Sequence, residues 1–507
     1  MKAFCHISTL IILFVFSVES STAQQIRKIE IISAKSMEYD EKIGNRAMRL
    51  IGDVVLKHED AYMYCDSGYL YRETNSFKAF NNVKILQGDS LLLTGTSLDY
   101  FGNTKLAKMR DSVVLKHYNS YLETDSLNYD RNDDVAYYFG GGEIFDIENH
   151  LVSKRGYYYT NDKEYIAVDS VILVNPQYKM YADTLKYNTE TEIAYFYGPT
   201  NIISDSNFIY CENGFYDTRK DLSAFSENAY LINGEQTLKG DSLFYDRNKR
   251  MGEAFINVSV IDTVENLIAE GNYALYFETP QHAMLVDSVF VTYITDGDSV
   301  FMNADTVLID IDTADNKLIR AYRHVQVFKS DAQARCDSLV YNSVDSISEM
   351  FGKPIIWAEG NQLTSDKMEL HFVDDEAHHV IMMGYAFIVN PEDTVHFSQI
   401  KGRKLVAYFR ENDIYKIDIF NDSQTLYYVR DEETEELIGL NKVVCNDMVV
   451  FRNNKTVEKI LFYDKPDGNL TPIEQLLPEN SFLPDFIWLD EYRPKSKFDI
   501  FYWENIK

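Results

Sequence analysis

Four of the five cysteines, those beyond Cys5, are the residues whose chemistry can be judged most directly from their spacing. No two of them form a Cys-x-x-Cys pair, which disfavours a metal site or a redox centre. Each stands directly before an acidic residue or an asparagine: Cys65 before Asp66, Cys211 before Glu212, Cys336 before Asp337, and Cys445 before Asn446. Because cysteine is small and often buried, the recurrence predicts a small buried slot at equivalent places along the chain.

Other residues offer weaker candidates for metal binding. Asp130, Asp133 and Asp134 could hold Ca²⁺, but their spacing does not follow a calcium-loop signature and favours a solvated turn. His378 and His379 are adjacent. Neighbouring residues of a strand point to opposite faces, so we expect these histidines not to share a ligand. The three glycines at 140–142 resemble a calcium-binding nonapeptide, but the pattern does not recur.

Signatures of catalysis are missing from the sequence. It contains no Gly-x-Ser-x-Gly, no His-Glu-x-x-His and no Gly-rich phosphate loop. An Asp recurs in the repeat motif Asp-Ser/Thr-Leu-x-Tyr, as at Asp125, Asp183 and Asp241. One carboxylate per repeat makes no acid–base pair, and we expect the motif Asp to form hydrogen bonds at a strand end. We therefore predict no catalytic residue, no metal site and no cofactor, in a protein that is not an enzyme.

The composition narrows the class of partner. The chain has 507 residues, 49 Lys and Arg against 79 Asp and Glu, and a formal charge of −30. Phosphate binding needs a basic stripe, so the acidic excess argues against nucleic acid and against charge-driven adhesion to an anionic membrane. Hydrophobic residues make up 45%, enough for a substantial core. The 37 Tyr and 30 Phe against 10 Pro favour strands.

The N-terminus has the pattern of a secretory signal. Lys2 is followed by a mostly apolar stretch at 7–18 and by small residues at 21–23. We interpret residues 1–23 as a cleaved signal peptide, too short to be a membrane span. Residues 380–389 form one of the longer apolar runs beyond it, which is also too short to span as a helix. The expected mature protein is exported and has no transmembrane helix.

The rest of the chain is organised as a repeat. Tyrosines recur every 29 residues: Tyr71, Tyr100, Tyr129, Tyr158, Tyr187, Tyr216 and Tyr245. The motif around them reads Asp-Ser/Thr-Leu-x-Tyr, with clear copies at 125–129, 183–187, 241–245 and 337–341 and looser copies elsewhere. A polar turn follows, then an apolar stretch interrupted by Gly or Asn. Each unit thus predicts two antiparallel strands of about ten residues, with a bend or bulge at the Gly or Asn. After Tyr245 the spacing widens, which predicts longer turns.

Periodicity within the units assigns faces. By the period of two, the Asp, Leu and Tyr of the motif share one face, with Leu127, Leu185, Leu243 and Leu339 facing the core. A unit of two strands advances a stacked sheet by ~9–10 Å, so Cys65 and Cys211 would lie on the order of 50 Å apart. A disulfide requires Cα atoms within about 7 Å, so we expect no intramolecular disulfide.

The last residues differ in composition from the repeats. Five of the ten prolines and two of the three tryptophans, Trp488 and Trp503, fall after residue 465. We place a boundary near 466 and expect residues 466–507 to form a non-repeating cap or a docking segment.

The repeat motif resembles the organic-solvent-tolerance (OstA-like) family, which includes the periplasmic lipopolysaccharide transport bridge. The resemblance rests on the Asp/Asn-Ser/Thr-Leu-x-Tyr strand, the polar turn, and the alternating strand that leads into Gly/Asn-x-Val. It extends over residues 24–465 and is best within 29–260, notably at 47–90 and 88–143. The chain is far longer than the family's short bridge proteins, and nothing downstream is similar to the large C-terminal barrel of the outer-membrane member.

The resemblance implies a fold and a function. The fold is all-β: repetitive antiparallel strands in units of about 29 residues, stacked as an elongated, open V-shaped β-jellyroll. Acyl chains lie in its apolar groove, where each CH₂ gains ~0.8 kcal/mol, while the headgroup stays in water. The implied function is lipopolysaccharide or glycolipid transfer to the outer membrane, from the periplasm or in association with that membrane. Ten residues are expected to line the groove: Val54, Val83, Leu98, Val113, Leu127, Val171, Leu185, Leu243, Val258 and Leu339.

Partners and alternatives follow from the same pattern. Unpaired strand edges at the two ends imply head-to-tail strand addition with other OstA-like components. The main alternative is a structural or surface β-repeat protein whose apolar face is only dry core. A transmembrane β-barrel and a polysaccharide-acting β-helix enzyme are further alternatives, the second disfavoured by the lack of a clustered acid–base set.

Overall fold

The computed structural model describes residues 27–39, 47–88, 91–146, 148–205, 207–295, 298–374, 376–410, 413–431, 433–453 and 456–506. The predicted signal peptide, residues 1–23, lies outside them. The all-β prediction is confirmed: the described residues form antiparallel strands, with four short 3₁₀ helices near the C-terminus. Among these residues no helix is long and apolar enough to cross a membrane. The chain divides into two compact units.

The N-terminal unit lies within residues 1–147 and 155–161. From β3 to β8 each strand pairs antiparallel with the next along the chain, and β1 and β2 both pair with β3. Its strands are β1 (Glu30–Ser33), β2 (Ser36–Tyr39), β3 (Met48–His58), β4 (Ala61–Tyr71), β5 (Ser76–Gln87), β6 (Leu91–Phe101), β7 (Leu106–His117), β8 (Ser120–Asp130), β9 (Val135–Tyr138), β10 (Gly142–Phe145) and β12 (Arg155–Tyr159).

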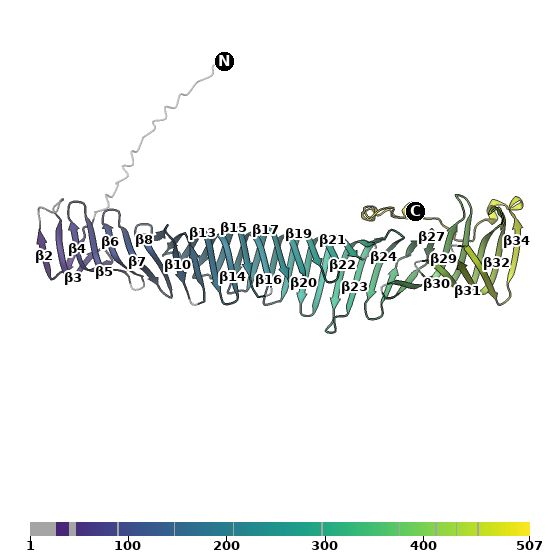
Figure 1. The fold of residues 1–507 in the computed structure, drawn as a ribbon, viewed down its shortest axis with the longest axis horizontal. Coiled ribbons are helices and arrows are strands. Elements are labelled where there is room, and N and C mark those ends of the chain that lie inside the picture. The colour runs from purple at the N-terminus through teal and green to yellow at the C-terminus, as the bar shows by residue number, and fades with distance from the viewer. Residues whose placement is uncertain are drawn as a thin grey trace, which may run out of the picture. The chain divides into compact units, whose positions relative to one another are not determined.

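The C-terminal unit consists of residues 148–154 and 162–507, and from β13 to β24 each of its strands pairs with the next along the chain (Figure 1). They are β11 (His150–Ser153), β13 (Glu164–Asn175), β14 (Tyr178–Asn188), β15 (Ile193–Ile203), β16 (Asn207–Asp217), β17 (Leu222–Asn233), β18 (Gln236–Asp246), β19 (Met251–Asp262), β20 (Leu267–Glu278), β21 (Gln281–Ile294), β22 (Ser299–Ile311) and β23 (Lys317–Phe328).

Longer and split strands complete this unit. They are β24 (Ala332–Asn342), β25 (Ile347–Phe351), β26 (Ile355–Ala358), β27 (Asn361–Thr364), β28 (Lys367–Val373), β29 (Glu376–Pro391), β30 (Phe397–Arg410), β31 (Asp413–Arg430), β32 (Leu437–Asn453), β33 (Thr456–Tyr463) and β34 (Asp467–Pro472). The 3₁₀ helices are η1 (Ile473–Gln475), η2 (Pro478–Asn480), η3 (Asp490–Tyr492) and η4 (Asp499–Phe501).

A β-bulge bends every second strand near its middle. Some bulges contain the Gly or Asn that predicted them, whereas others, such as Asp111–Ser112 and Asp169–Ser170, contain neither. Two successive residues with positive φ face one residue of the partner strand, for example Asn81–Asn82, Asp111–Ser112 and Glu227–Asn228. The glycines at 140–142 occupy the same position, where one strand is split into β9 and β10 that both pair with β8. Because bulges bend a strand, each strand has two arms joined at a corner.

We name the arms by their residues. The Tyr arm carries the Leu and Tyr of the repeat motif, and the Val arm carries the residue that follows the bulge, usually valine. Along both arms buried residues alternate with more exposed ones, as in β7 and β8. The buried positions define an inner face on each arm.

The corner corrects one assignment of the sequence analysis. Leu127 and Tyr129 share the inner face, but Asp125 does not, because the alternation of β8 changes phase at the corner and leaves that carboxylate exposed. Nor does the motif acid lie at a strand end. Asp66, Glu212 and Asp241 each accept a hydrogen bond, at 2.8, 2.9 and 3.1 Å, from the asparagine of the bulge on the next strand. The motif acid therefore holds the bend.

Two further expectations need revision. Tyr71 belongs to the 29-residue series in sequence, but Leu70 is the residue that occupies the inner position equivalent to Tyr100. The wider spacing after Tyr245 comes from longer strands rather than only from longer turns: β31 has 18 residues and β32 has 17, against 11 in β18, and only two residues separate β20 from β21.

Residues 473–506, which we call the C-terminal segment, run back over the outer face of the Val arm from β32 to β22 (Figure 1). Buried glutamines bind its backbone. The Gln399 side chain donates to Ser481 O and accepts from Leu483 N, at 2.9 and 2.8 Å. Gln362 binds Ile487 O and Leu489 N in the same way, at 2.9 and 2.7 Å.

The C-terminal segment, which covers the outer face of the Val arm, explains why residues 380–389 are apolar. In β29 the inner residues Ala386 and Ile388 alternate with Phe387 and Val389, which pack on the outer side against Leu483 of the C-terminal segment. Both faces of this arm are thus buried, so the sequence shows no alternation there.

Candidate functional site

The ten predicted groove residues all lie on the inner face, each with no more than 8% of its surface exposed. They form two rows. One row contains the first residue after each bulge: Val54, Val83, Val113, Val171 and Val258. The other contains the motif leucine or its counterpart: Leu98, Leu127, Leu185, Leu243 and Leu339. The two rows flank the corner, one on each arm.

The small slot predicted from the cysteines is confirmed. Each cysteine pairs across the ladder with the residue after a bulge: Cys65 with Val54, Cys211 with Thr200, Cys336 with Val325 and Cys445 with Ser423. Other repeats fill the slot with Gly95, Thr124 or Ala182. The corner leaves little room, since a Cβ on Gly95 would lie 2.6 Å from Met109 Cγ. The four thiols are buried and free, and burial raises the pKa of Cys65, Cys211 and Cys336 to about 12.

Sequence reasoning missed the inner rows farther from the corner. On the Val arm of the N-terminal unit these are Leu56, Ile85, Leu93, Leu115 and Leu122, all fully buried. Counting back by twos from each small slot residue would have found Leu93 and Leu122. Together with the two corner rows they make the inner face apolar along the whole arm.

In the N-terminal unit, hydrogen bonds join the two arms at their ends farthest from the corner. We call these ends the free edges. His58 Nδ1 lies 2.6 Å from Tyr100 Oη, and Tyr129 Oη donates to Gln87 Oε1 at 3.0 Å. His117 Nδ1 contacts Tyr158 Oη in the same way. In each pair the partner of the tyrosine, which is His58, Gln87 or His117, ends a strand of the Val arm. The tyrosine is about 42 residues further on, in the Tyr arm.

Arg131 braces this network. Its guanidinium donates to Tyr100 Oη at 2.8 Å and to Gln87 Oε1 at 3.1 Å, and it also contacts Asp60. Lys105 and Glu59 form a further ion pair between turns of the two arms, at 2.8 Å. We call the pairs His58–Tyr100, Gln87–Tyr129 and His117–Tyr158, together with Arg131, the tyrosine locks.

The protonation states of His58 and Tyr100 suit the hydrogen bond between them. The His58 Nε2 atom lies 3.0 Å from the carbonyl oxygen of Arg27, which leaves Nδ1 as an acceptor for the Tyr100 hydroxyl. Burial lowers the pKa of His58 and raises the pKa of Tyr100, so the neutral forms are favoured in both. At the His58–Tyr100 pair the two arms are therefore joined by a neutral hydrogen bond, which the buried guanidinium of Arg131 supports.

In the C-terminal unit the equivalent positions are more open. Arg247 stands four 29-residue repeats after Arg131 and still reaches Gln177, at 3.1 Å. However, its side chain is 55% exposed, whereas that of Arg131 is 2% exposed. The hydroxyl of Tyr216 donates to Asp221 on its own turn, at 3.0 Å, and that of Tyr245 donates to Glu278, at 2.6 Å.

Strands β18–β22, which we call the open stretch, expose part of the inner face. Leu243, Val258 and Val289 next to the corner are buried. Farther out Tyr276 on the Tyr arm and Tyr293 on the Val arm are 38% and 41% exposed. The residues between are half-buried: Leu238, Val260, Val291, Met302 and Ile309. An apolar surface that reaches solvent at the rim can receive an apolar ligand.

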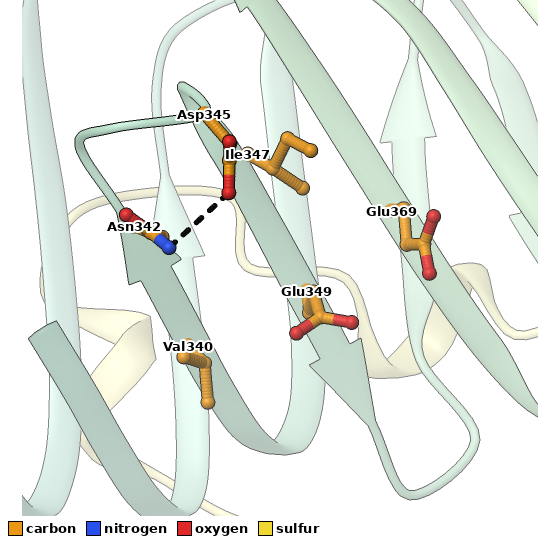
Figure 2. A pocket seen from close by; sticks show the side chains of 6 residues that line it. All are labelled: Val340, Asn342, Asp345, Ile347, Glu349 and Glu369. Atoms are coloured by element: carbon orange, nitrogen blue, oxygen red, sulfur yellow. Dashed lines mark hydrogen bonds between the residues drawn. The ribbon is translucent and has the colours of Figure 1, made fainter. Parts of the chain in front are cut away.

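A shallow depression on β24, β25 and β28 has a different character (Figure 2). It is lined by Val340, Asn342, Asp345, Ile347, Glu349 and Glu369. These residues alternate with the inner residues Leu339, Met350 and Met368, so they lie on the outer face. Lys367 bridges Glu349 and Glu369, at 2.9 Å from the latter. The depression is polar and separate from the apolar rows.

The metal candidates of the sequence are accounted for by local contacts. Asp130 accepts from the backbone of Asn132 and Asp134 accepts from Asn161, both at 2.9 Å. The Nδ1 atoms of His378 and His379 lie 2.8 Å apart, contrary to the expectation of opposite faces, because the register shifts beside them. Within the described ranges, no three His, Cys, Asp or Glu side chains are grouped so as to hold a metal ion.

Comparison with known proteins identifies the family. The model of the family described as OstA-like protein matches residues 26–183, 179–241 and 203–294, which together span more than half of the chain. The chain therefore belongs to the OstA-like family, as its repeat motif predicted.

Other comparisons are more distant. No curated protein matches the chain significantly. Among solved structures, one match is LptH of Pseudomonas aeruginosa, described as the LptA-homologous periplasmic component of the lipopolysaccharide transport device. It shares 13% identity, with a TM-score of 0.21, over 28% of this chain and 97% of LptH.

Proposed function

We propose that this protein binds lipopolysaccharide or a related multi-acyl glycolipid in the periplasm and passes it towards the outer membrane. The observation that carries the proposal is the apolar inner face, which repeats in an OstA-like chain and is partly exposed in the open stretch. Acyl chains would lie against the rows of Leu243 and Val258, and the headgroup would remain in water at the rim. No catalytic residue takes part.

The energetics favour multi-acyl lipids. Each buried CH₂ contributes ~0.8 kcal/mol, so one acyl chain of ordinary length gains on the order of 10 kcal/mol before the entropy of ordering is subtracted. Near-equal slots in successive repeats give near-equal binding energies, so lipid can move along the face without a deep minimum. The matching LptH protein is a component of a lipopolysaccharide transport device, which agrees with this ligand class.

Strands β1 and β2 offer a partner site. Within the described residues, β1 and β2 are paired with β3 alone, and Ile32, Met37 and Tyr39 on them are more than half exposed. Edge strands with exposed apolar side chains can accept a strand from another sheet. We propose that another OstA-like component adds there head-to-tail. Retention of every partner contact after deletion of residues 27–39 would refute this docking site.

A structural β-repeat protein is the second candidate. The N-terminal unit favours it, because Leu98 and Leu127 are buried and the tyrosine locks join its arms, as in a dry core. Native mass spectrometry and lipid extraction separate the two functions. The test uses the full chain, purified from a bacterium with an outer membrane. Co-purified or added lipopolysaccharide bound to the protein supports the proposal, whereas a lipid-free protein that also takes up no added lipopolysaccharide supports the structural function.

A further inference from the structure

The tyrosine locks affect where a lipid can reach the inner face, which the proposed function does not specify. A glycolipid headgroup is large and polar, and it cannot enter an apolar interior without losing its hydration. A lipid can therefore occupy the inner face only where the free edges of the two arms are apart. The N-terminal unit and the open stretch differ in this respect, although both are built from the same repeat.

The tyrosine locks join side chains of opposite arms, and the locked residues are not partners in the backbone strand pairing. The backbone of Tyr100 pairs with Phe77 and Ala107, whereas His58 ends β3 opposite Ala61. Only the side chains connect the two edges, and His58, Gln87 and His117 recur at 29- and 30-residue spacing to do so. Breaking them requires no change in strand pairing.

In the open stretch the corresponding groups bind elsewhere. The Tyr245 hydroxyl binds Glu278, the last residue of β20, and Tyr276 and Tyr293 are exposed at the rims of opposite arms. Partly exposed contacts still join the arms there: Lys317 pairs with Glu265 at 2.6 Å, with side chains 30% and 51% exposed, and Arg247 binds Gln177 at 3.1 Å. Because water reaches both contacts, they are weaker than the buried contacts of Arg131, and the inner face is more accessible there than in the N-terminal unit.

We propose that acyl chains enter the protein from the side at the open stretch, and that the tyrosine locks keep the N-terminal unit closed to lipid until they break. This inference rests on the proposed function and adds to it the place of entry and a gate. The locks suit a gate because three hydroxyl bonds and one guanidinium can open in steps, while the ladder of each arm keeps its hydrogen bonds.

The inference can be tested with photo-leucine, a diazirine analogue close to leucine in size, incorporated throughout the full chain. After incubation with lipopolysaccharide and irradiation, mass spectrometry compares cross-linked peptides of both units in one sample. We expect lipid on Leu238, Leu243 and Leu285 of the open stretch and none on Leu122 and Leu127 of the N-terminal unit. Leu275, on the outer face of β20, is the internal control and should remain unmodified.

A lock variant then tests the gate. Tyr100→Phe combined with Tyr129→Phe removes two hydroxyls and keeps the ring volumes, and we expect cross-linking of Leu122 and Leu127 to rise to the level of Leu243. The matched control is Tyr69→Phe, which removes a hydroxyl from the outer face of β4 and should leave these peptides unmodified. Hydrogen exchange of β4–β7 reports whether the variant keeps its ladder.

The outcomes separate this inference from the proposed function. Equal cross-linking of Leu127 and Leu243 in the unaltered protein would overturn the gate while leaving lipid binding intact. A folded double variant with no lipid on Leu127 would also overturn it. Absence of lipid from every inner leucine of both units would instead refute the proposed function, and the gate with it.

Discussion

The N-terminal unit and the open stretch differ most clearly at one pair of equivalent arginines. Arg131 is buried and binds Tyr100, Gln87 and Asp60, whereas Arg247 is mostly exposed and binds Gln177 at the surface. The repeat motif around the two residues is the same. The comparison teaches that one backbone pattern can give either a closed interior or an accessible apolar face, depending on a few polar side chains at the free edges.

The largest expected effect concerns the C-terminal segment, which has no counterpart in the N-terminal unit among the described residues. Deleting residues 473–507 would expose Phe387, Val389, Leu426 and Tyr428, each of which contributes about 1.5–3 kcal/mol by burial. We expect faster hydrogen exchange in β26–β32 and a tendency to aggregate, with unchanged exchange in β3–β8. Unchanged exchange in β26–β32 would show that the segment is dispensable for that arm.

A matched pair of leucines sharpens the comparison of the two interiors. Leu122 is fully buried in β8, and Leu238, four repeats later in β18, is half-buried. Leu122→Ala should lower the local free energy of unfolding by about 2–5 kcal/mol, because it leaves a cavity, and Leu238→Ala by about 1 kcal/mol. Hydrogen exchange of the neighbouring strands measures both. Equal losses at the two sites would mean that the open stretch is as well packed as the N-terminal unit.

The arginines provide a second matched pair. Arg131→Met removes the donor to Tyr100, Gln87 and Asp60, and we expect a loss of about 2–3 kcal/mol in the N-terminal unit. Arg247→Met breaks an exposed contact and should change stability by less than about 0.5 kcal/mol. Urea titration followed by region-resolved exchange compares the two. A small effect at Arg131 would contradict its bracing role.

The smallest effect is the part of the acid sensitivity of the N-terminal unit that comes from His58. Burial lowers the pKa of His58 below its ordinary value of 6.5, so the unfolded chain binds a proton more readily than the folded one. Stability is then fully present above the unfolded pKa and is lost as pH falls through it towards the folded pKa. Gln87 occupies the equivalent position one repeat later, so His58→Gln should keep the bond to Tyr100 and reduce this acid sensitivity. An unchanged pH profile in that variant would assign the sensitivity to other groups.

The sequence predicted the repeat, the strands and the ten inner residues, because alternation and the 29-residue period are properties of neighbouring positions. It predicted the small slot for the same reason, since Cys65, Gly95 and Thr124 are all small. It could not place Asp125, because the phase change at the corner depends on the partner strand. Residues about 42 positions apart, such as His58 and Tyr100, meet only when the arms face each other, so the tyrosine locks had no local signal.

The C-terminal segment shows the same limit. Its prolines and tryptophans marked it as different, but its path over β22–β32 depends on glutamines 82 to 174 residues away in the chain. The apolar run at 380–389 was the available hint, because a strand without alternation needs cover on both faces.

Hydrogen exchange of the unaltered full chain, with and without lipopolysaccharide, is the most direct test of the account. We predict slower exchange in β18–β22 when lipopolysaccharide is added, and no change in β3–β8 while the tyrosine locks are closed. Identical exchange in both samples along the whole chain would contradict lipid binding at the inner face, and slower exchange in β3–β8 alone would contradict entry at the open stretch.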